Sequence, residues 1–403
     1  MIAVRFLRLY VLRLPRGGLL TKVRALYAIY ISVAISYLGV GLVAPLISLV
    51  LHERGASRFV VGLVGTTMFA AFTLASFPLG HTTDKVGAKP VLVCGLALYG
   101  ISILLFAFIE QTWLFFVVRA VEGVAAAAIS VATETMINHL SEHKERARRM
   151  GYYALSVAIG WALGPLSGTA LFSIRQWIPF VGCFIFSGAA AIMVSMLVPR
   201  VLSNDHTLSG VAAGISKRLV VPVSGGLLYG YLMSSLVTLF PLYLSRKGIA
   251  DIEMGAIITS VIVGAIAAQI PIAKLADRFG KHSTLLAGAI LQAGLFVLMT
   301  AQSSTPFFIG IAVLIGASAG TLYPLALAII GEIVASDRLG RATALFSLAF
   351  GFGSLSGPAL SGLTMDRLGD RWLFYLPAIL AATFSLLIPA MDFLMPRRAS
   401  GTG

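Results

Sequence analysis

Long apolar stretches, separated by short polar segments, run along almost the whole chain. A hydrocarbon core about 30 Å thick is crossed by about 20 helical residues, and α-helices satisfy their own backbone groups where no water can do so. Windows of that length predict twelve spans, at 26–51, 59–80, 90–109, 112–139, 151–172, 178–198, 222–245, 253–273, 283–302, 306–331, 342–364 and 372–394. The pattern therefore predicts an all-α polytopic membrane protein.

The composition agrees with that prediction and argues against other classes of protein. Hydrophobic residues make up 58% of the chain and charged residues 11%, whereas soluble domains are about a quarter charged. The net charge of +14 comes from Lys and Arg in the short polar segments, with no long basic block, so no nucleic-acid partner is expected. Cys94 and Cys183 each fall in an apolar span, in different predicted helices. We therefore expect two buried core residues rather than a disulfide or a metal-binding pair. No cofactor or metal is expected.

The distribution of Lys and Arg predicts the orientation in the membrane. With the N-terminus inside, the cytoplasmic segments hold 22 of these residues, the opposite side holds seven, and Arg119 lies within a span. Positive charge favours the cytoplasmic side, so we expect a cell (inner) membrane protein with both termini cytoplasmic, acting as a monomer in the lipid bilayer. The expected parts are a basic arm at 1–24, six-helix bundles at 25–198 and 222–394, a cytoplasmic linker at 199–221 and a tail at 395–403.

The two halves repeat each other at one constant offset of 193 residues. The register pairs Gly55 with Gly248, Gly62 with Gly255, Asp84 with Asp277, Gly87 with Gly280, Gly123 with Gly316, Arg148 with Arg341, Gly160 with Gly353, Gly164 with Gly357 and Pro165 with Pro358. Such duplication is typical of secondary transporters, whose binding site lies near the midplane between the repeats.

One short motif occurs at the same place in both halves, as GHTTDKVGAK at 80–89 and AKLADRFGKH at 273–282. Both copies resemble the loop signature G-x-L-a-D-R-x-G-R-K of the major facilitator superfamily, and the resemblance covers residues 26–394. Thr82, Ala88 and Ala273 depart from the pattern. The resemblance implies a transporter, not an enzyme, with two six-helix bundles in pseudo-two-fold symmetry. It also implies a gating loop formed by Gly80, Asp84, Lys85, Gly87, Lys89, Asp277, Arg278 and Gly280, although turn capping would explain the carboxylates equally well.

The fourth span carries charge, in the segment RAVEGVAAA at 119–127. A charge in mid-bilayer costs several kcal/mol unless it is paired or faces water. At 100° per residue, one polar arc of about 120° holds Arg119, Glu122, Ser130, Thr133 and Glu134, and it should face a cavity. The spacing allows Arg119 and Glu122 to pair. Arg119 would favour the ionised carboxylate and dehydration the neutral one, as suits a proton site, while a purely structural ion pair is the alternative.

The same segment is similar to the family motif R-x-x-q-G-x-g-a-a, which is tied to proton transfer in drug:proton antiporters. Glu122 stands where Gln is usual. By this resemblance Arg119 and Glu122 would carry proton coupling. Glu134 lies near the cytoplasmic end of the span, and we expect it to form a structural ion pair with cations of the loop signature.

The fifth span has a distinctive glycine series: Gly151, Gly160, Gly164, Pro165 and Gly168. It resembles the antiporter signature G-x8-G-x3-G-P-x2-G-G, with Thr169 replacing the last Gly. Glycines on one face let helices pack backbone to backbone, and ordinary small-residue packing is the alternative reading. In the family this version accompanies export.

Polar and aromatic residues in other spans are candidates for the substrate cavity. Their rings and hydroxyls could hold an amphipathic solute, although interface or packing roles fit each of them as well. The cavity candidates are Tyr30, Tyr37, Ser130, Thr133, Tyr231, Ser234, Thr321 and Tyr323.

These patterns predict a secondary active transporter. The leading hypothesis is proton-coupled efflux of small amphipathic compounds by alternating access. Proton-linked or facilitated uptake of a nutrient or metal chelate is a second hypothesis, and a non-transporting membrane sensor or assembly factor is a third. A nucleotide-driven pump is not expected, because the chain has no G-x-x-x-x-G-K-[ST] motif.

Overall fold

The computed structural model describes residues 19–141, 145–199, 217–301, 304–334 and 338–394. Most of the expected arm at 1–24, most of the linker at 199–221 and the tail at 395–403 lie outside these residues. The described regular elements are all helices: α2 (Leu19–Val43), α3 (Leu46–Glu53), α4 (Arg58–Val86), α5 (Ala88–Leu105), α6 (Thr112–Leu140), α7 (Arg146–Ile174), α8 (Ile178–Leu197), η2 (Lys217–Leu219), α9 (Val220–Arg246), α10 (Asp251–Phe279), α11 (Lys281–Leu298), α12 (Thr305–Ile333), α13 (Leu339–Leu368) and α14 (Trp372–Leu394).

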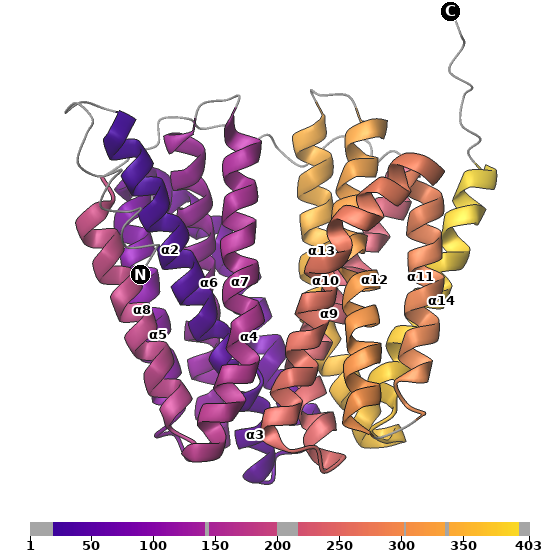
Figure 1. Ribbon diagram of the computed structural model, residues 1–403, viewed down its shortest axis with the longest axis horizontal. Coiled ribbons are helices and arrows are strands. Elements are labelled where there is room, and N and C mark those ends of the chain that lie inside the picture. Colours follow the sequence, from indigo (N-terminus) through magenta and orange to yellow (C-terminus); the bar gives the residue numbers. More distant parts are fainter. Residues whose placement is uncertain (1–18, 142–144, 200–216, 302–303, 335–337, 395–403) are drawn as a thin grey trace, which may run out of the picture.

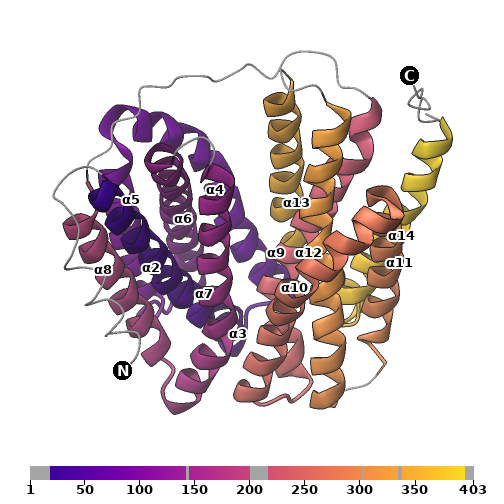
Figure 2. The same ribbon diagram turned by 45° about the horizontal axis from the view of Figure 1, so that its top comes forward.

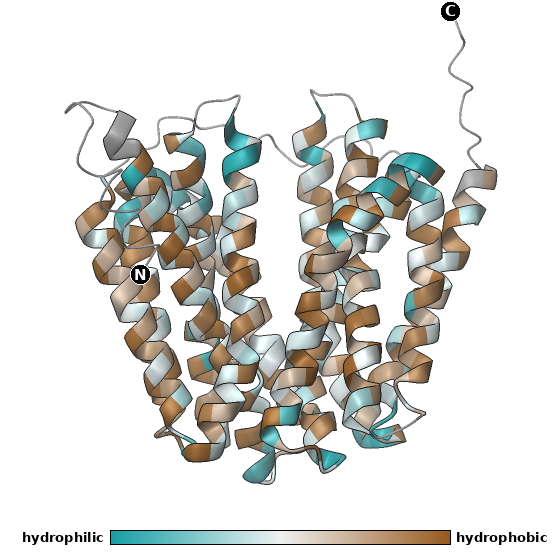
Figure 3. Ribbon diagram, viewed as in Figure 1, coloured by the Kyte–Doolittle hydropathy of each residue, from teal (hydrophilic) through white to brown (hydrophobic). Residues whose placement is uncertain are grey.

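The expected fold class is confirmed. Within the described ranges, twelve helical segments are long and apolar enough to cross a membrane. Apolar residues dominate the middle of the helices, and polar residues gather at their two ends (Figure 3). Such a band suits a bilayer core about 30 Å thick.

Several helix boundaries differ from the predicted spans. The first span is two helices, α2 and α3, which are separated at Ala44 and Pro45 because proline has no N–H to continue the helical hydrogen bonds. The loop signatures are largely helical and form the last turns of α4 and α10. The chain reverses only at Gly87 and Gly280, with φ of 97° and 87°, in a region of backbone space that is open essentially to glycine alone.

The helices form two groups, α2–α8 and α9–α14, which lie side by side (Figure 1). In the first group α2 packs on α7, α4 on α6 and α5 on α8; in the second, α9 packs on α13, α10 on α12 and α11 on α14. The 193-residue register is kept in detail: a Cβ on Gly160 would strike the backbone of Ala34, and one on Gly353 would strike the backbone of Leu227. The sequence repeat is therefore a structural repeat.

The two groups touch mainly through two helix pairs, α4 with α13 and α7 with α10, and α9 makes smaller contacts with α3 and α4. Gly62 lies against the carbonyl oxygen of Pro358, and Gly255 lies against that of Pro165. These contacts involve the beginnings of α4 and α10 and the later halves of α7 and α13. Toward the opposite end, where α4 joins α5 and α10 joins α11, the groups diverge (Figures 1 and 2). We call the touching end the closed side and the diverging end the open side.

Candidate functional site

A cavity of about 410 Å³ lies between the two groups of helices and is lined by both. Because the contacts between the groups are on the closed side, the cavity is reached from the open side. Most of its wall is apolar or aromatic. Its polar and aromatic lining includes Tyr99, Arg119, Glu122, Trp161, Tyr229, Ser234, Gln269 and Phe350.

Arg119 and Glu122 form an ion pair in the wall of this cavity. Arg119 Nη1 donates to both carboxylate oxygens of Glu122, at 2.9 and 3.1 Å, and the side chains are one turn apart on α6. The residues are 8% and 3% exposed. The pairing predicted from the i, i+3 spacing is therefore present.

Aromatic groups complete the surroundings of the pair. Tyr99 on α5 donates its hydroxyl to Glu122 Oε1 at 3.4 Å, and the Arg119 guanidinium lies 5.8 Å from the centre of the Phe106 ring. Arg119 Nε has no hydrogen-bond partner within the described chain. Removing one charge of a buried ion pair is costly, because the other charge stays buried without a partner. Protonation of Glu122 would therefore leave the Arg119 guanidinium without its charged acceptor.

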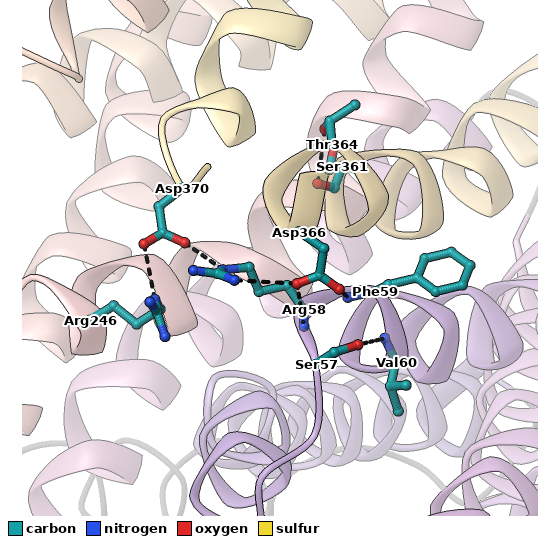
Figure 4. Close-up of polar contacts among 9 residues, drawn as sticks. All are labelled: Ser57, Arg58, Phe59, Val60, Arg246, Ser361, Thr364, Asp366 and Asp370. Carbon is teal, nitrogen blue, oxygen red and sulfur yellow. Dashed lines mark hydrogen bonds and ion pairs between the residues drawn. The ribbon is translucent and has the colours of Figure 1, made fainter. Parts of the chain in front are cut away.

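A second charged cluster fastens the closed side (Figure 4). Arg58, at the start of α4, donates to Asp366 Oδ1 at 3.3 Å and to Asp370 Oδ1 at 2.6 Å. Arg246 on α9 donates to Asp370 Oδ2 at 2.9 Å. We call these four residues the latch, because Arg58 belongs to the first group of helices and the other three to the second.

Asp366 also caps a helix that belongs to the other group. Its carboxylate accepts the backbone N–H groups of Arg58 and Phe59, at 3.1 and 2.9 Å, which are otherwise unpaired donors at the start of α4. The positive end of the helix dipole favours a carboxylate there. Ser57 Oγ adds a local cap by accepting from the N–H of Val60 at 3.3 Å.

Asp370 is held in its ionised form by the latch. Partial burial opposes ionisation, but the hydrogen bonds from Arg58 and Arg246 outweigh it and hold the pKa of Asp370 below its ordinary value. The carboxylate therefore stays charged at neutral pH and keeps both arginines as partners.

The residues of the loop signature lie on the open side, away from the latch. Lys89 donates to the carbonyl oxygen of Ser195 at 2.7 Å, and the Arg278 guanidinium lies 5.2 Å from the centre of the Phe279 ring. Asp84, Lys85 and Asp277 belong to the last turns of α4 and α10, and Gly80 precedes them by one turn. Among the ion pairs described, those that join the two groups of helices are all in the latch.

The glycine series of α7 has a definite packing role. Cβ atoms on Gly160, Gly164 and Gly168 would strike the backbone of α2, whereas one on Gly151 would meet no atom within 4 Å. Pro165 carries the carbonyl group that lies against Gly255 of α10. One helix thus packs on its own group through glycines and on the other group at its proline.

The cavity candidates are in several environments. Ser234 lines the cavity. The Tyr231 hydroxyl is buried 2.7 Å from Ser361 Oγ, between α9 and α13. Tyr30 donates to the carbonyl oxygen of Arg149 at 3.2 Å, and Thr133 is fully buried.

The other candidates lie on α2, α6 and α12. Ser130 donates to Glu134 at 3.1 Å, and no Lys or Arg of the described chain forms an ion pair with Glu134. Tyr37 interacts with Tyr153 on α7, and Tyr323 belongs to an aromatic cluster on α9, α12 and α13. The side chain of Thr321 is outside the part of the chain that the structure describes.

Sequence reasoning missed Tyr99 and the latch. Tyr99 is 23 residues from Glu122, and Arg58 is 312 residues from Asp370, so no local spacing connects them. A weak signal existed for the latch, because Asp366 and Asp370 are one helical turn apart in a chain that has only 16 acidic residues.

Two repeated helical bundles around a shared cavity define a transporter architecture, and comparison with known proteins agrees. The model of the Major Facilitator Superfamily matches residues 29–250 and 222–402. The chain belongs to this superfamily, so the expectation of a multi-pass membrane transporter rather than an enzyme is confirmed.

Curated relatives are similar over nearly their whole length. The chain is 25% identical over 359 residues to the uncharacterized MFS-type transporter YfkF of Bacillus subtilis (strain 168), covering 87% of this chain and 90% of the relative. It is 26% identical over 368 residues to the uncharacterized MFS-type transporter YcaD of Escherichia coli O139:H28, covering 87% and 91%.

Solved structures share the fold at low sequence identity. The nucleoside transporter NupG has a TM-score of 0.76 at 14% identity, covering 91% of this chain and 98% of its own. A bacterial homologue of the human lysosomal transporter Spinster, in an inward-facing and unoccupied conformation, has a TM-score of 0.75 at 14% identity, covering 94% and 99%.

Proposed function

We propose that this transporter is a proton-coupled exporter of small amphipathic compounds. The observation that carries the proposal is the Arg119–Glu122 ion pair, which lies in the wall of a cavity shared by the two groups of helices. Glu122 is the one acidic residue in the described lining of that cavity. The apolar and aromatic remainder of the wall suits the body of an amphipathic solute.

Proton and solute would compete through this ion pair. When the solute binds from the cytoplasm, it favours the ionised Arg119–Glu122 pair, and Glu122 releases its proton. When Glu122 takes a proton from the other side, the pair breaks, the affinity for the solute falls and the solute leaves. Coupling in this scheme is a difference in affinity between two protonation states, as linkage requires.

We infer that the open side faces the cytoplasm. The excess of Lys and Arg in the segments assigned to that side supports this orientation, as does the similarity of fold to a neighbour described as inward-facing. The glycine series of α7, which accompanies export in the family it resembles, supports the direction. In this orientation the cavity loads from the cytoplasm and the latch closes the outer end.

The proposal is tested with Glu122→Gln. A compound panel on an efflux-deficient host, with and without the wild-type protein, identifies transported solutes. In proteoliposomes an imposed pH gradient should then drive these solutes with the wild type and with Glu110→Gln, a control at an exposed carboxylate, but not with Glu122→Gln.

The control for folding uses the same variant. Glu122→Gln should retain solute counterflow without a pH gradient, because exchange needs no net proton movement. Full gradient-driven transport by Glu122→Gln would refute the proton role, and accumulation only in the opposite direction would refute export.

A further inference from the structure

A second carboxylate, Glu134, lies on the same helix as Glu122, on the way to the open side. It is 12 residues further along α6, which is about 18 Å at 1.5 Å per residue. The Glu134 side chain is partly exposed, and its described hydrogen bond comes from Ser130 Oγ, at 3.1 Å. Within the described ranges no Lys or Arg forms an ion pair with this carboxylate, which makes it a candidate for binding a cation.

Tyrosines of three other helices lie close enough to this carboxylate to be influenced by its charge. They are Tyr37 on α2, Tyr153 on α7 and Tyr323 on α12. The first two lie in the same group of helices as Glu134, and Tyr323 lies in the other group. The site is therefore divided between the two repeats, as expected of a solute path that both line.

Tyr323 connects this region to the main cavity. Its ring centre is 5.5 Å from that of Tyr229 and 5.8 Å from that of Phe350, and both of these residues line the cavity. Aromatic faces attract cations through their quadrupole. An aromatic wall on one group of helices thus extends from the cavity to the neighbourhood of the carboxylate on the other.

We propose that Glu134, with Tyr323 and its aromatic neighbours, forms a subsite for the positively charged head group of an organic cation. The carboxylate supplies the charge, the rings supply cation–π contacts, and the apolar cavity takes the rest of the molecule. This inference rests on the proposed function in one respect, since it takes the cavity to be the solute path. It deepens that proposal by naming the charge of the solute.

The test uses two ions of nearly the same shape and opposite charge. Tetraphenylphosphonium and tetraphenylborate are titrated into the wild-type protein in nanodiscs, without any gradient. The wild type should bind the cation more tightly than the anion. Glu134→Gln should lose at least about tenfold in affinity for the cation, because one partner of a desolvated charge pair is removed, and should lose its discrimination between the two ions.

Three further variants locate the effect. Tyr323→Leu should weaken tetraphenylphosphonium binding by about threefold or more, and Tyr323→Phe should restore it, because the ring face is kept. Glu110→Gln should bind as the wild type does. Thermal unfolding of each variant shows whether it remains folded.

Several results would overturn the subsite. These are unchanged cation affinity in a folded Glu134→Gln protein, equal binding of the two ions by the wild type, or no binding of the cation by the wild type. The proposed function fails separately, in the pH-gradient assay of Glu122→Gln, because equilibrium binding without a gradient does not depend on proton coupling.

Discussion

The two contacts that close the molecule follow the same backbone plan and differ in charge. α4 meets α13 at Gly62 and Pro358, and α10 meets α7 at Gly255 and Pro165, each residue 193 positions from its counterpart. Beside the first contact lies the latch. In the second, the positions that correspond to Asp366 and Asp370 hold Ser173 and Trp177, and the position that corresponds to Arg58 holds Asp251.

This difference separates the geometry of helix packing from the free energy that charged groups add to it. Glycine and proline determine how closely the helices approach, and both repeats keep them. The latch adds free energy to one contact only. Partly exposed ion pairs contribute about 0.2–1 kcal/mol each and hydrogen bonds to charged groups about 1.5–3 kcal/mol. The latch is therefore expected to contribute a few kcal/mol to the closed state of the closed side. The α10–α7 contact, which has no latch, is expected to open and close together with it.

Distances across the two sides can be measured with spin labels on a protein in which Cys94 and Cys183 are replaced by alanine. Labels at Ser173 and Ala250 report on the closed side, and labels at Thr82 and Arg341 on the open side. None of the four labelled positions is a residue of the latch or one of the contacting glycines and prolines. Population changes at these pairs are the readout for the predictions that follow.

The largest effect is expected from placing a bulky side chain at the glycine of either contact. Gly62→Leu places a side chain where the carbonyl oxygen of Pro358 now lies, and Gly255→Leu places one where the Thr169 hydroxyl lies, beside the backbone of Pro165 and Leu166. Overpacking costs about 1–3 kcal/mol in a core that can relax, and more where backbone must move. Both variants should lose most of the short-distance population at Ser173 and Ala250, and most of their transport.

A matched substitution tests whether size alone is harmful. A Cβ on Gly188 of α8 meets no atom within 4 Å, so Gly188→Leu should behave as the wild type does. If Gly255→Leu left the closed-side distances unchanged, the shared packing plan would be refuted.

A smaller effect is expected from removing the charge of the latch, which lies beside the α4–α13 contact and has no counterpart at the α10–α7 contact. Arg58→Gln breaks the two ion pairs of the latch that cross between the groups, and Asp366 and Asp370 lose this partner. The closed-side population should fall by about tenfold, which corresponds to about 1.4 kcal/mol. The open-side labels should show the complementary change.

Two other arginines calibrate this result. Arg246→Gln removes a pair that lies within the second group and only orients Asp370, so its effect should be weaker. Arg175→Gln removes a cation near the other contact and should have almost none. Equal effects from all three would mean that net charge, rather than the latch, stabilises closure.

The fold could be predicted from sequence because its causes are local or periodic. Span length follows from bilayer thickness, and the repeat is visible in one register that pairs Gly62 with Gly255. The break at Pro45 and the helical course of the loop signatures were missed. The loop signature reads as a turn, yet only Gly87 and Gly280 have the backbone angles of one.

The candidate site was predictable only where its partners lie on one helix. Arg119 and Glu122 are one turn apart, so their spacing predicts the pair. Tyr99 and the latch bring together segments far apart in the chain, and helix packing alone decides which side chains meet. The same limit explains Tyr231, a polar residue in a span that faces Ser361 on a neighbouring helix.

The smallest effect is expected from a change of pH on the closed side, and the direction of that effect follows from the pKa of Asp370. Because the pKa of Asp370 is below its ordinary value in the closed state, the contribution of this group to closure is fully present above that ordinary value, about 3.9. It is lost only as pH falls through the lowered pKa. The latch should therefore be insensitive to pH from about 8 to about 5.

Other carboxylates titrate with the same proton, so this experiment is done with Glu122→Gln and Glu134→Gln combined. In that protein the distances between Ser173 and Ala250 should not change over the stated range. A loss of the closed population already near pH 6 would show that closure does not depend on an ionised Asp370 held by its arginines. If adding Arg58→Gln moved such a change to higher pH, the pairing would be present but weaker than its geometry indicates.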